Sequence, residues 1–230
     1  VYDDLLMGIL DGRALQLVVG ARGLGRTTVL ERIAEGLKST EFDCVFVSAK
    51  ACSYDELLGQ LANELPLADE TVSTTLPLPE RVAHALAFQR AEGRPVVILI
   101  DDAELMGPAV LNELPSLLAS DAGDPLAQFA LTVQPGFAQR LTSAELDRLN
   151  AAIDGIVQLS PWDLTTVTDY ICARVESASG DAGTLLSWDA IEALYGHSRG
   201  IPLLVNRLGR DALTQAYQEG KRRVGVEHVE

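Results

Sequence analysis

Short apolar runs alternate with helical patterns over the first 160 residues of the chain. The apolar runs have the length of buried strands, and they lie at residues 14–19, 44–47, 96–100, 129–133 and 156–159. Apolar residues three and four positions apart predict helices at residues 2–10, 27–37, 54–65, 80–92 and 109–120. Regular alternation of strands and helices is typical of a parallel sheet, so we predict an α/β fold with helices on both faces.

The pattern changes after Ser160 and Pro161, where the strand-like runs stop. Helical periodicity continues over residues 162–177, 187–195 and 201–217. We therefore expect an α/β core over residues 1–160 and an all-helical subdomain over residues 161–230. Within the core, the polar segment 69–79 is predicted to be a loop, and Pro115 is expected to kink the helix that contains it.

A glycine-rich loop directly follows the first predicted strand, and it reads Gly20-Ala21-Arg22-Gly23-Leu24-Gly25-Arg26-Thr27-Thr28. Glycines let backbone N–H groups converge on phosphate oxygens, and the helix that begins at once directs its positive dipole end at an anion. The hydroxyl of Thr27 supplies a ligand for Mg²⁺, and a cation is needed for the outer phosphates. These residues predict a P-loop for ATP or ADP, with Arg26 where lysine is expected. A glycine-rich turn without a ligand is the alternative.

Two carboxylates follow the third predicted strand, because the apolar run Val96 to Ile100 leads into Asp101 and Asp102. The carboxyl ends of parallel strands usually face a ligand crevice. This is the form of a Walker B segment, in which Asp101 holds Mg²⁺ and Asp102 polarises the attacking water. Most such ATPases have glutamate at the second position. Capping of the following helix is the alternative role.

The chain is acidic, with a formal net charge of −15, which argues against nonspecific nucleic-acid binding. The basic residues near the C-terminus, Arg210 and Lys221 to Arg223, are expected to be solvated helix faces. The cysteines Cys44, Cys52 and Cys172 lack metal-site spacing and fit a reducing, cytoplasmic compartment, with Cys44 predicted to be a buried thiol. No basic signal-peptide region and no membrane-spanning apolar run occur in the sequence, so tethering to an inner membrane would need segments outside this chain.

Several segments together resemble the AAA+ ATPases of the general secretion pathway protein A type and, more distantly, the transposition-helper ATPases. The matching segments are residues 4–10, Ile100-Asp101-Asp102-Ala103-Glu104-Leu105, Gln134-Pro135, Gly200-Ile201-Pro202 and residues 212–224. The resemblance covers the chain from Asp4 to Val229. It implies a five-stranded sheet in the order 5-1-4-3-2, a C-terminal helical lid, and a sensor 1 residue at Gln134 that would act in catalysis beside Asp102.

Four charged positions of the family pattern are changed in this chain. Arg26 replaces the Walker A lysine, Asp102 the Walker B glutamate, and Leu203 the sensor 2 arginine. Residues 150–153 lack the arginine finger that is common before the fifth strand, and such a finger is worth ~10³–10⁵ in rate. Arg148, Arg199 and Arg207 lie close enough in sequence to be substitutes, and each is also explained as an ordinary surface arginine.

These features lead to three hypotheses. The first, which the four changes favour, is a degenerate AAA+ domain that binds ATP or ADP with Mg²⁺ weakly or not at all. It would work as an assembly or regulatory module with a protein partner of a cell-envelope or secretion machine. The second is an active ATPase motor that forms a homo-oligomer and uses Arg26 and Asp102. The third is a DNA-binding transposition helper, which the acidic charge disfavours.

Overall fold

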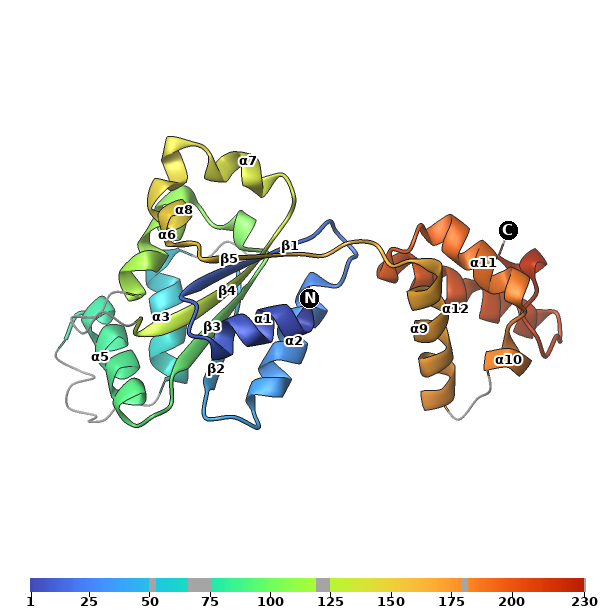
Figure 1. Cartoon of the computed structure of the whole chain (residues 1–230), viewed down its shortest axis with the longest axis horizontal. Helices are drawn as coiled ribbons and strands as arrows, with labels where there is room; N and C mark the ends of the chain where they lie inside the picture. Colours follow the sequence, from blue (N-terminus) through green and yellow to red (C-terminus); the bar gives the residue numbers. More distant parts are fainter. Residues whose placement is uncertain (50–52, 66–75, 119–124, 179–181, 230) are drawn as a thin grey trace. The chain divides into compact units, whose positions relative to one another are not determined.

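Figure 1 shows the computed structural model of the chain, which describes residues 1–49, 53–65, 76–118, 125–178 and 182–229. Its contacts divide it into two compact units. The first comprises Val1–Ala21 and Arg26–Leu159, and the second comprises Arg22–Gly25 and Ser160–Glu230. Cys52 and residues 69–75 of the predicted loop lie outside the described residues. In the part of the chain that is described, no helix is long and apolar enough to cross a membrane.

A parallel five-stranded sheet forms the centre of the first unit (Figure 1). Its strands are β1 (Leu15–Val19), β2 (Asp43–Ser48), β3 (Val96–Asp101), β4 (Ala127–Val133) and β5 (Gly155–Gln158). Their order is β2-β3-β4-β1-β5, which confirms the predicted order. Ser48 pairs with Asp101 and Val19 with Val133, so the carboxyl ends of the central strands meet at one edge.

Helices cover both faces of this sheet, as predicted. The helices of the first unit are α1 (Tyr2–Leu10), α2 (Arg26–Leu37), α3 (Tyr54–Glu64), α5 (Leu78–Ala91), α6 (Pro108–Glu113), α7 (Phe137–Leu141) and α8 (Asp147–Ala152). Side chains of a strand alternate between its faces, so Val97 and Leu99 pack with α1 and α2, while Ile98 and Ile100 pack with α3 and α5. Every residue of β3 is therefore buried, and its polar end Asp101 is fixed by apolar packing on both sides.

Some local predictions are wrong in their bounds. The predicted helix 109–120 ends as an α-helix at Glu113, and a 3-10 turn, Leu114–Leu117, follows it. Proline has no N–H group for the α-helical ladder, so Pro115 breaks the helix rather than bending it.

Cys44, which was predicted to be buried, is only half-buried. Burial raises the pKa of its thiol to about 11, and the negative charge of Glu64 is a smaller cause of this rise.

The second unit is built from α9 (Leu164–Ser177), α10 (Ala182–Leu185), α11 (Trp188–Ser198) and α12 (Pro202–Gln218). Its apolar core includes Val167, Leu194, Val205 and Ala212. α9 begins two residues later than predicted because Asp163 caps it: the Asp163 carboxylate accepts the N–H of Thr166 at 2.7 Å. Hydrogen bonds from the side chain of Thr166 and from its backbone N–H lower the pKa of Asp163. Trp162, predicted to be helical, instead donates its backbone N–H to the carbonyl of Gly200 at 2.9 Å.

Candidate functional site

The glycine-rich loop joins β1 to α2. Gly23 and Gly25 have φ angles of 89° and 90°, a left-handed backbone that side chains rarely tolerate, so glycine is required at both positions. α2 begins at Arg26, and Arg26, Thr27 and Thr28 form its first turn, whose backbone N–H groups have no partner within the helix. Of the other predicted loop residues, Gly20 and Leu24 are buried, whereas Ala21 and Arg22 are exposed.

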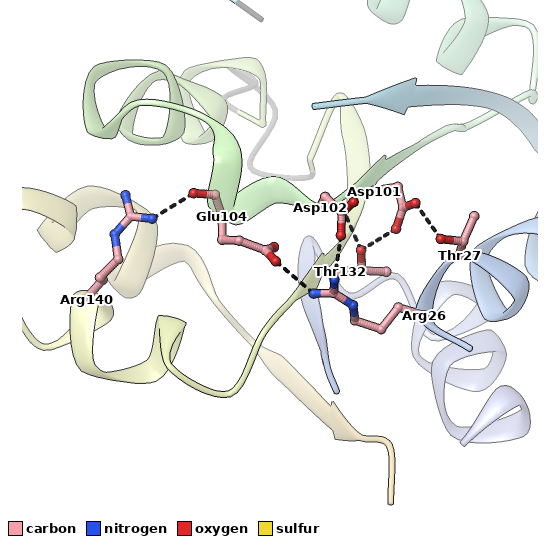
Figure 2. Close-up of polar contacts among 7 residues, drawn as sticks. All are labelled: Arg26, Thr27, Asp101, Asp102, Glu104, Thr132 and Arg140. Carbon is pink, nitrogen blue, oxygen red and sulfur yellow. Dashed lines mark hydrogen bonds and ion pairs between the residues drawn. The ribbon is translucent and has the colours of Figure 1, made fainter. Parts of the chain in front are cut away.

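Asp101 lies between two threonine hydroxyls at the end of β3 (Figure 2). Thr27 donates its hydroxyl to one carboxylate oxygen of Asp101 at 2.6 Å, and Thr132 donates to the other oxygen at 2.6 Å. Thr132 comes from β4, the strand next to β3, and its hydroxyl also accepts the backbone N–H of Asp102 at 2.9 Å. The structure therefore brings Thr27 and Asp101, the two predicted Mg²⁺ ligands, into direct contact.

The guanidinium of Arg26 is paired with two carboxylates, as Figure 2 shows. Its Nη2 lies 2.5 Å from Oδ1 of Asp102, and its Nη1 lies 2.9 Å from Oε1 of Glu104. The Arg26 side chain is only 9% exposed. A planar guanidinium can hold two carboxylates at once, which the compact ammonium of lysine does less well. The cation of the loop and the acid predicted to activate water are thus bound to each other.

Glu104 lies in a 3-10 turn, Ala103–Leu105, immediately after the acidic pair. Its side chain is 12% exposed, and its Oε2 has no hydrogen-bond partner among the described residues. The backbone carbonyl of Glu104 accepts a hydrogen bond from Nη1 of Arg140 at 2.8 Å. Arg140 also lies over the ring of Phe137, and its Cζ is 5.2 Å from the ring centroid. Glu104 is therefore fixed from its backbone by α7 and from its side chain by α2.

The backbone of Asp102 is left-handed, with φ 55° and ψ 41°. Aspartate is one of the few residues other than glycine that enter this region with some frequency. The conformation turns the chain sharply at the end of β3, so that Asp102 and Glu104 both face the guanidinium of Arg26 (Figure 2). The alternative role for Asp102, a side-chain cap of the following turn, is not seen, because its side chain makes no capping hydrogen bond.

Other predicted residues do not join this cluster. Gln134 follows β4 and is exposed at the edge where the strands end. Arg148, a suggested substitute for the finger, is held by Glu113 at 3.0 Å and by the hydroxyl of Ser116. Leu203 lies on α12 of the second unit and is 56% exposed. Arg207 lies on the same helix, and Arg199 follows the end of α11 in the same unit. The positions 150–152 that lack a finger arginine form the end of α8.

Sequence reasoning did not select Glu104, Thr132 or Arg140 as site residues. Thr132 carried a usable signal, because it is a hydroxyl residue inside an apolar strand that runs beside the Asp101 strand. Glu104 lies in a segment that resembles the family, but nothing in the sequence links Glu104 or Arg140 to its partner, since each gains that partner only through the fold.

The oxygen groups at Asp101 suit a hard divalent cation. Mg²⁺ is usually held by one or two carboxylates together with phosphate oxygens and water. Thr27 and Asp101 offer a hydroxyl and a carboxylate side by side next to the first turn of α2, so the residues present fit Mg²⁺ bound to a nucleotide. Such an ion would supply positive charge to the phosphates. Asp102 would act on water only after its carboxylate is released from Arg26.

Comparison with known protein families gives a match over more than half of the chain. The family described as AAA domain matches residues 10–141. Among curated proteins, general secretion pathway protein A of Aeromonas hydrophila is 27% identical over 218 residues. That alignment covers 94% of this chain and 40% of the relative, so the chain corresponds to less than half of that protein's length.

The chain also shares its fold with several solved structures. Cdc6p from Pyrobaculum aerophilum has a TM-score of 0.70 at 17% identity, covering 97% of this chain and 62% of that one. The ORC2 protein of Aeropyrum pernix, in ADPNP–ADP complexes, has a TM-score of 0.72 at 15% identity, and the match covers 99% of this chain and 64% of that one. The Holliday junction branch migration motor RuvB of Thermotoga maritima has a TM-score of 0.65 at 17% identity, and the match covers 99% of this chain and 66% of that one. At these identities the likeness shows the fold alone.

Proposed function

Because the chain belongs to the AAA domain family, with the sheet order of P-loop AAA+ proteins, we propose that it binds ATP or ADP with Mg²⁺ and hydrolyses ATP slowly. Residues 1–160 would form the nucleotide-binding core and residues 161–230 the helical lid. In this proposal the loop residues 20–28 surround the phosphates, and Thr27 and Asp101 hold the metal ion. Asp102 and Gln134 act on the attacking water.

The observation that carries slow turnover is the double pairing of Arg26. The carboxylate of Asp102 is bound to the Arg26 guanidinium at 2.5 Å, so this carboxylate is occupied and is not free to position the attacking water. Leu203 and the residues 150–153 add to this, because neither position offers the positive charge that stabilises the transition state in related ATPases. Binding of nucleotide is less affected, since the glycines and the first turn of α2 are intact.

We also propose that the nucleotide state regulates assembly with a protein partner of a secretion or cell-envelope machine in the cytoplasm. Support comes from the relative that is named a general secretion pathway protein and aligns with 94% of this chain. The acidic charge of −15 favours a protein partner over a nucleic acid.

Calorimetric titration with Mg·ATP and Mg·ADP tests the proposal. We expect micromolar binding of both nucleotides, lost in Gly25→Val because a β-branched residue does not adopt φ 90°. Gly93→Val is the matched control: Gly93 also has positive φ, 75°, but precedes β3 at the opposite end of that strand. If no nucleotide gives heat with the wild-type protein, the proposed binding of ATP and ADP fails.

A faster ATPase is the second candidate, and the intact contact between Thr27 and Asp101 favours it. Steady-state phosphate release separates the two. Turnover near 1 s⁻¹ or above, on the order of ordinary enzyme rates, that disappears in Asp102→Asn would establish an active motor. A sharp gain of activity in Arg26→Lys, from a wild-type protein without measurable turnover, would exclude it.

A further inference from the structure

We infer that Glu104 is a positioning residue that holds Arg26 in a latch, and that the outer phosphate of ATP opens this latch. The inference rests on the proposed nucleotide binding and names how that same site is regulated. The latch consists of Arg26, Asp102 and Glu104, joined by the two ion pairs of 2.5 and 2.9 Å. In the closed latch, the guanidinium of Arg26 is not available to the phosphates. The carboxylate of Asp102 is likewise not available to the attacking water.

The two arms of the latch differ in their exposure to water. The side chain of Asp102 is 33% exposed, whereas that of Glu104 is 12% exposed. Water weakens an ion pair that it can reach, so the arm to Glu104 is the stronger anchor of the guanidinium. Glu104 is also held through its backbone by Arg140 of α7, which keeps its carboxylate in place when Arg26 leaves.

A triphosphate can compete with these carboxylates for Arg26. Arg26 is the first residue of α2, directly after the glycine-rich loop, and its planar fork matches a phosphate as well as it matches a carboxylate. The outer phosphate of ATP brings more negative charge to this position than ADP does, so ATP opens the latch more effectively. Opening frees the carboxylate of Asp102 in the same step, and the acid therefore becomes available only when ATP is bound.

Glu104 holds Arg26 through one oxygen only, because its buried Oε2 has no hydrogen-bond partner among the described residues. A carboxylate that binds a guanidinium through both oxygens holds it more firmly. The ion pair to a single oxygen therefore gives up less binding free energy when Arg26 exchanges Glu104 for a phosphate.

The test compares ATP and ADP affinities of Glu104→Gln with those of the wild-type protein by calorimetry. Glutamine keeps the shape of the side chain but cannot form the ion pair. We expect about tenfold tighter ATP binding, the size of one charge-assisted hydrogen bond, and a gain for ADP of only about twofold. Glu113→Gln is the matched control because it removes the carboxylate partner of Arg148, an ion pair of 3.0 Å elsewhere in the first unit. Its affinities should stay at the wild-type values.

Two further variants separate a latch from a structural role. Glu104→Asp retains the charge and should bind ATP nearly as the wild-type protein does. In an Arg26→Lys background, ATP binding should already be tighter, and adding Glu104→Gln should give less than about a threefold gain, because one ammonium holds the two carboxylates less firmly. These variants also serve if Glu104→Gln alone proves too unstable to purify.

The outcomes are distinct. If the wild-type protein binds nucleotide and Glu104→Gln changes its affinity no more than Glu113→Gln does, the latch is refuted while nucleotide binding stands. If the wild-type protein binds none and Glu104→Gln binds ATP, Glu104 keeps the site closed but ATP does not open it, so the proposed opening by ATP is refuted. If neither protein binds any nucleotide, both the latch and the proposed function are refuted.

Discussion

A single buried hydroxyl, that of Thr132, serves both members of the acidic pair. It donates to Asp101 at 2.6 Å and accepts the backbone N–H of Asp102 at 2.9 Å, and its residue is fully buried. Thr132→Val keeps the shape but leaves both groups without this partner, so we expect the free energy of unfolding to fall by about 2–3 kcal/mol. Urea denaturation followed by circular dichroism measures this change in the free energy of unfolding.

Thr132→Ser is the control for this prediction, since serine keeps the hydroxyl and loses only a methyl group. We expect it to lower the free energy of unfolding by about 1 kcal/mol. A loss in the valine variant no larger than that in the serine variant would contradict the prediction, because the hydroxyl would then contribute no more to stability than the methyl group does.

Cys44 shows how burial acts on one side chain. Burial raises the pKa of its thiol from 9.0 to about 11, so below pH 9 the thiolate fraction is lower by ~100-fold than in the unfolded chain. Thiolate is the reactive form, and we expect iodoacetamide to label native Cys44 at pH 8 about 100-fold more slowly than in urea. Peptide mapping by mass spectrometry reads each cysteine separately. Equal native and unfolded rates at Cys44 would contradict the buried environment.

Among the elements, β3 shows what the sequence could predict. Its run of apolar residues followed by two aspartates indicates a buried strand whose polar end faces a ligand, and the structure buries every residue of it. The parallel sheet with two covered faces followed from the alternation of strands and helices. The strand order followed from the family resemblance instead, because periodicity carries no information about which strands are neighbours.

The short elements and the Arg26 contacts could not be predicted in the same way. α7 and α8 contain only five and six residues, too few for a helical period to stand out from the surrounding sequence. Arg26 meets Asp102 and Glu104 across 76 and 78 residues of sequence. No local pattern reports such a pairing. The substitution of lysine by arginine marked the position as unusual without showing which partners the guanidinium has.

The turn between α11 and α12 depends on Gly200. This residue has φ 71°, and a Cβ atom there would lie 1.9 Å from the carbonyl oxygen of Trp162, a backbone atom that cannot move aside easily. Gly200→Ala should therefore lower the free energy of unfolding of the second unit by about 3 kcal/mol or more. Thermal unfolding followed by tryptophan fluorescence is a suitable measurement, because Trp162 lies at the turn and Trp188 begins α11.

Gly209→Ala is the matched control within α12. A Cβ atom at Gly209 would meet nothing within 4 Å, and alanine favours the helix over glycine by about 0.5–1 kcal/mol. We therefore expect opposite signs for the two substitutions. A destabilisation of similar size in both variants would show that the close approach at Trp162 is not what requires glycine at position 200.

For the molecule as a whole, the net charge of −15 bears on the class of ligand that the protein binds. Its structural neighbours include the ORC2 protein of Aeropyrum pernix and the Holliday junction branch migration motor RuvB of Thermotoga maritima, at 15% and 17% identity. A similar fold at this identity does not show which partner the protein binds. The net charge of −15, in contrast, repels any negatively charged ligand that approaches the protein. A duplex presents a dense row of phosphates, and binding to it requires clustered basic side chains that neutralise several of them.

We therefore expect no binding of this chain to duplex DNA, with or without Mg·ATP. Fluorescence anisotropy of a labelled duplex at about 50 mM salt should stay flat up to a protein concentration of about 100 μM, where nonspecific DNA binders are already bound. Low salt is the strictest condition because it gives the largest electrostatic gain. Binding that weakens with salt, with a slope of log K against log salt near −0.9 per phosphate contact, would contradict the expectation. The count of contacts from that slope would then show how large a basic surface the protein presents despite its net charge.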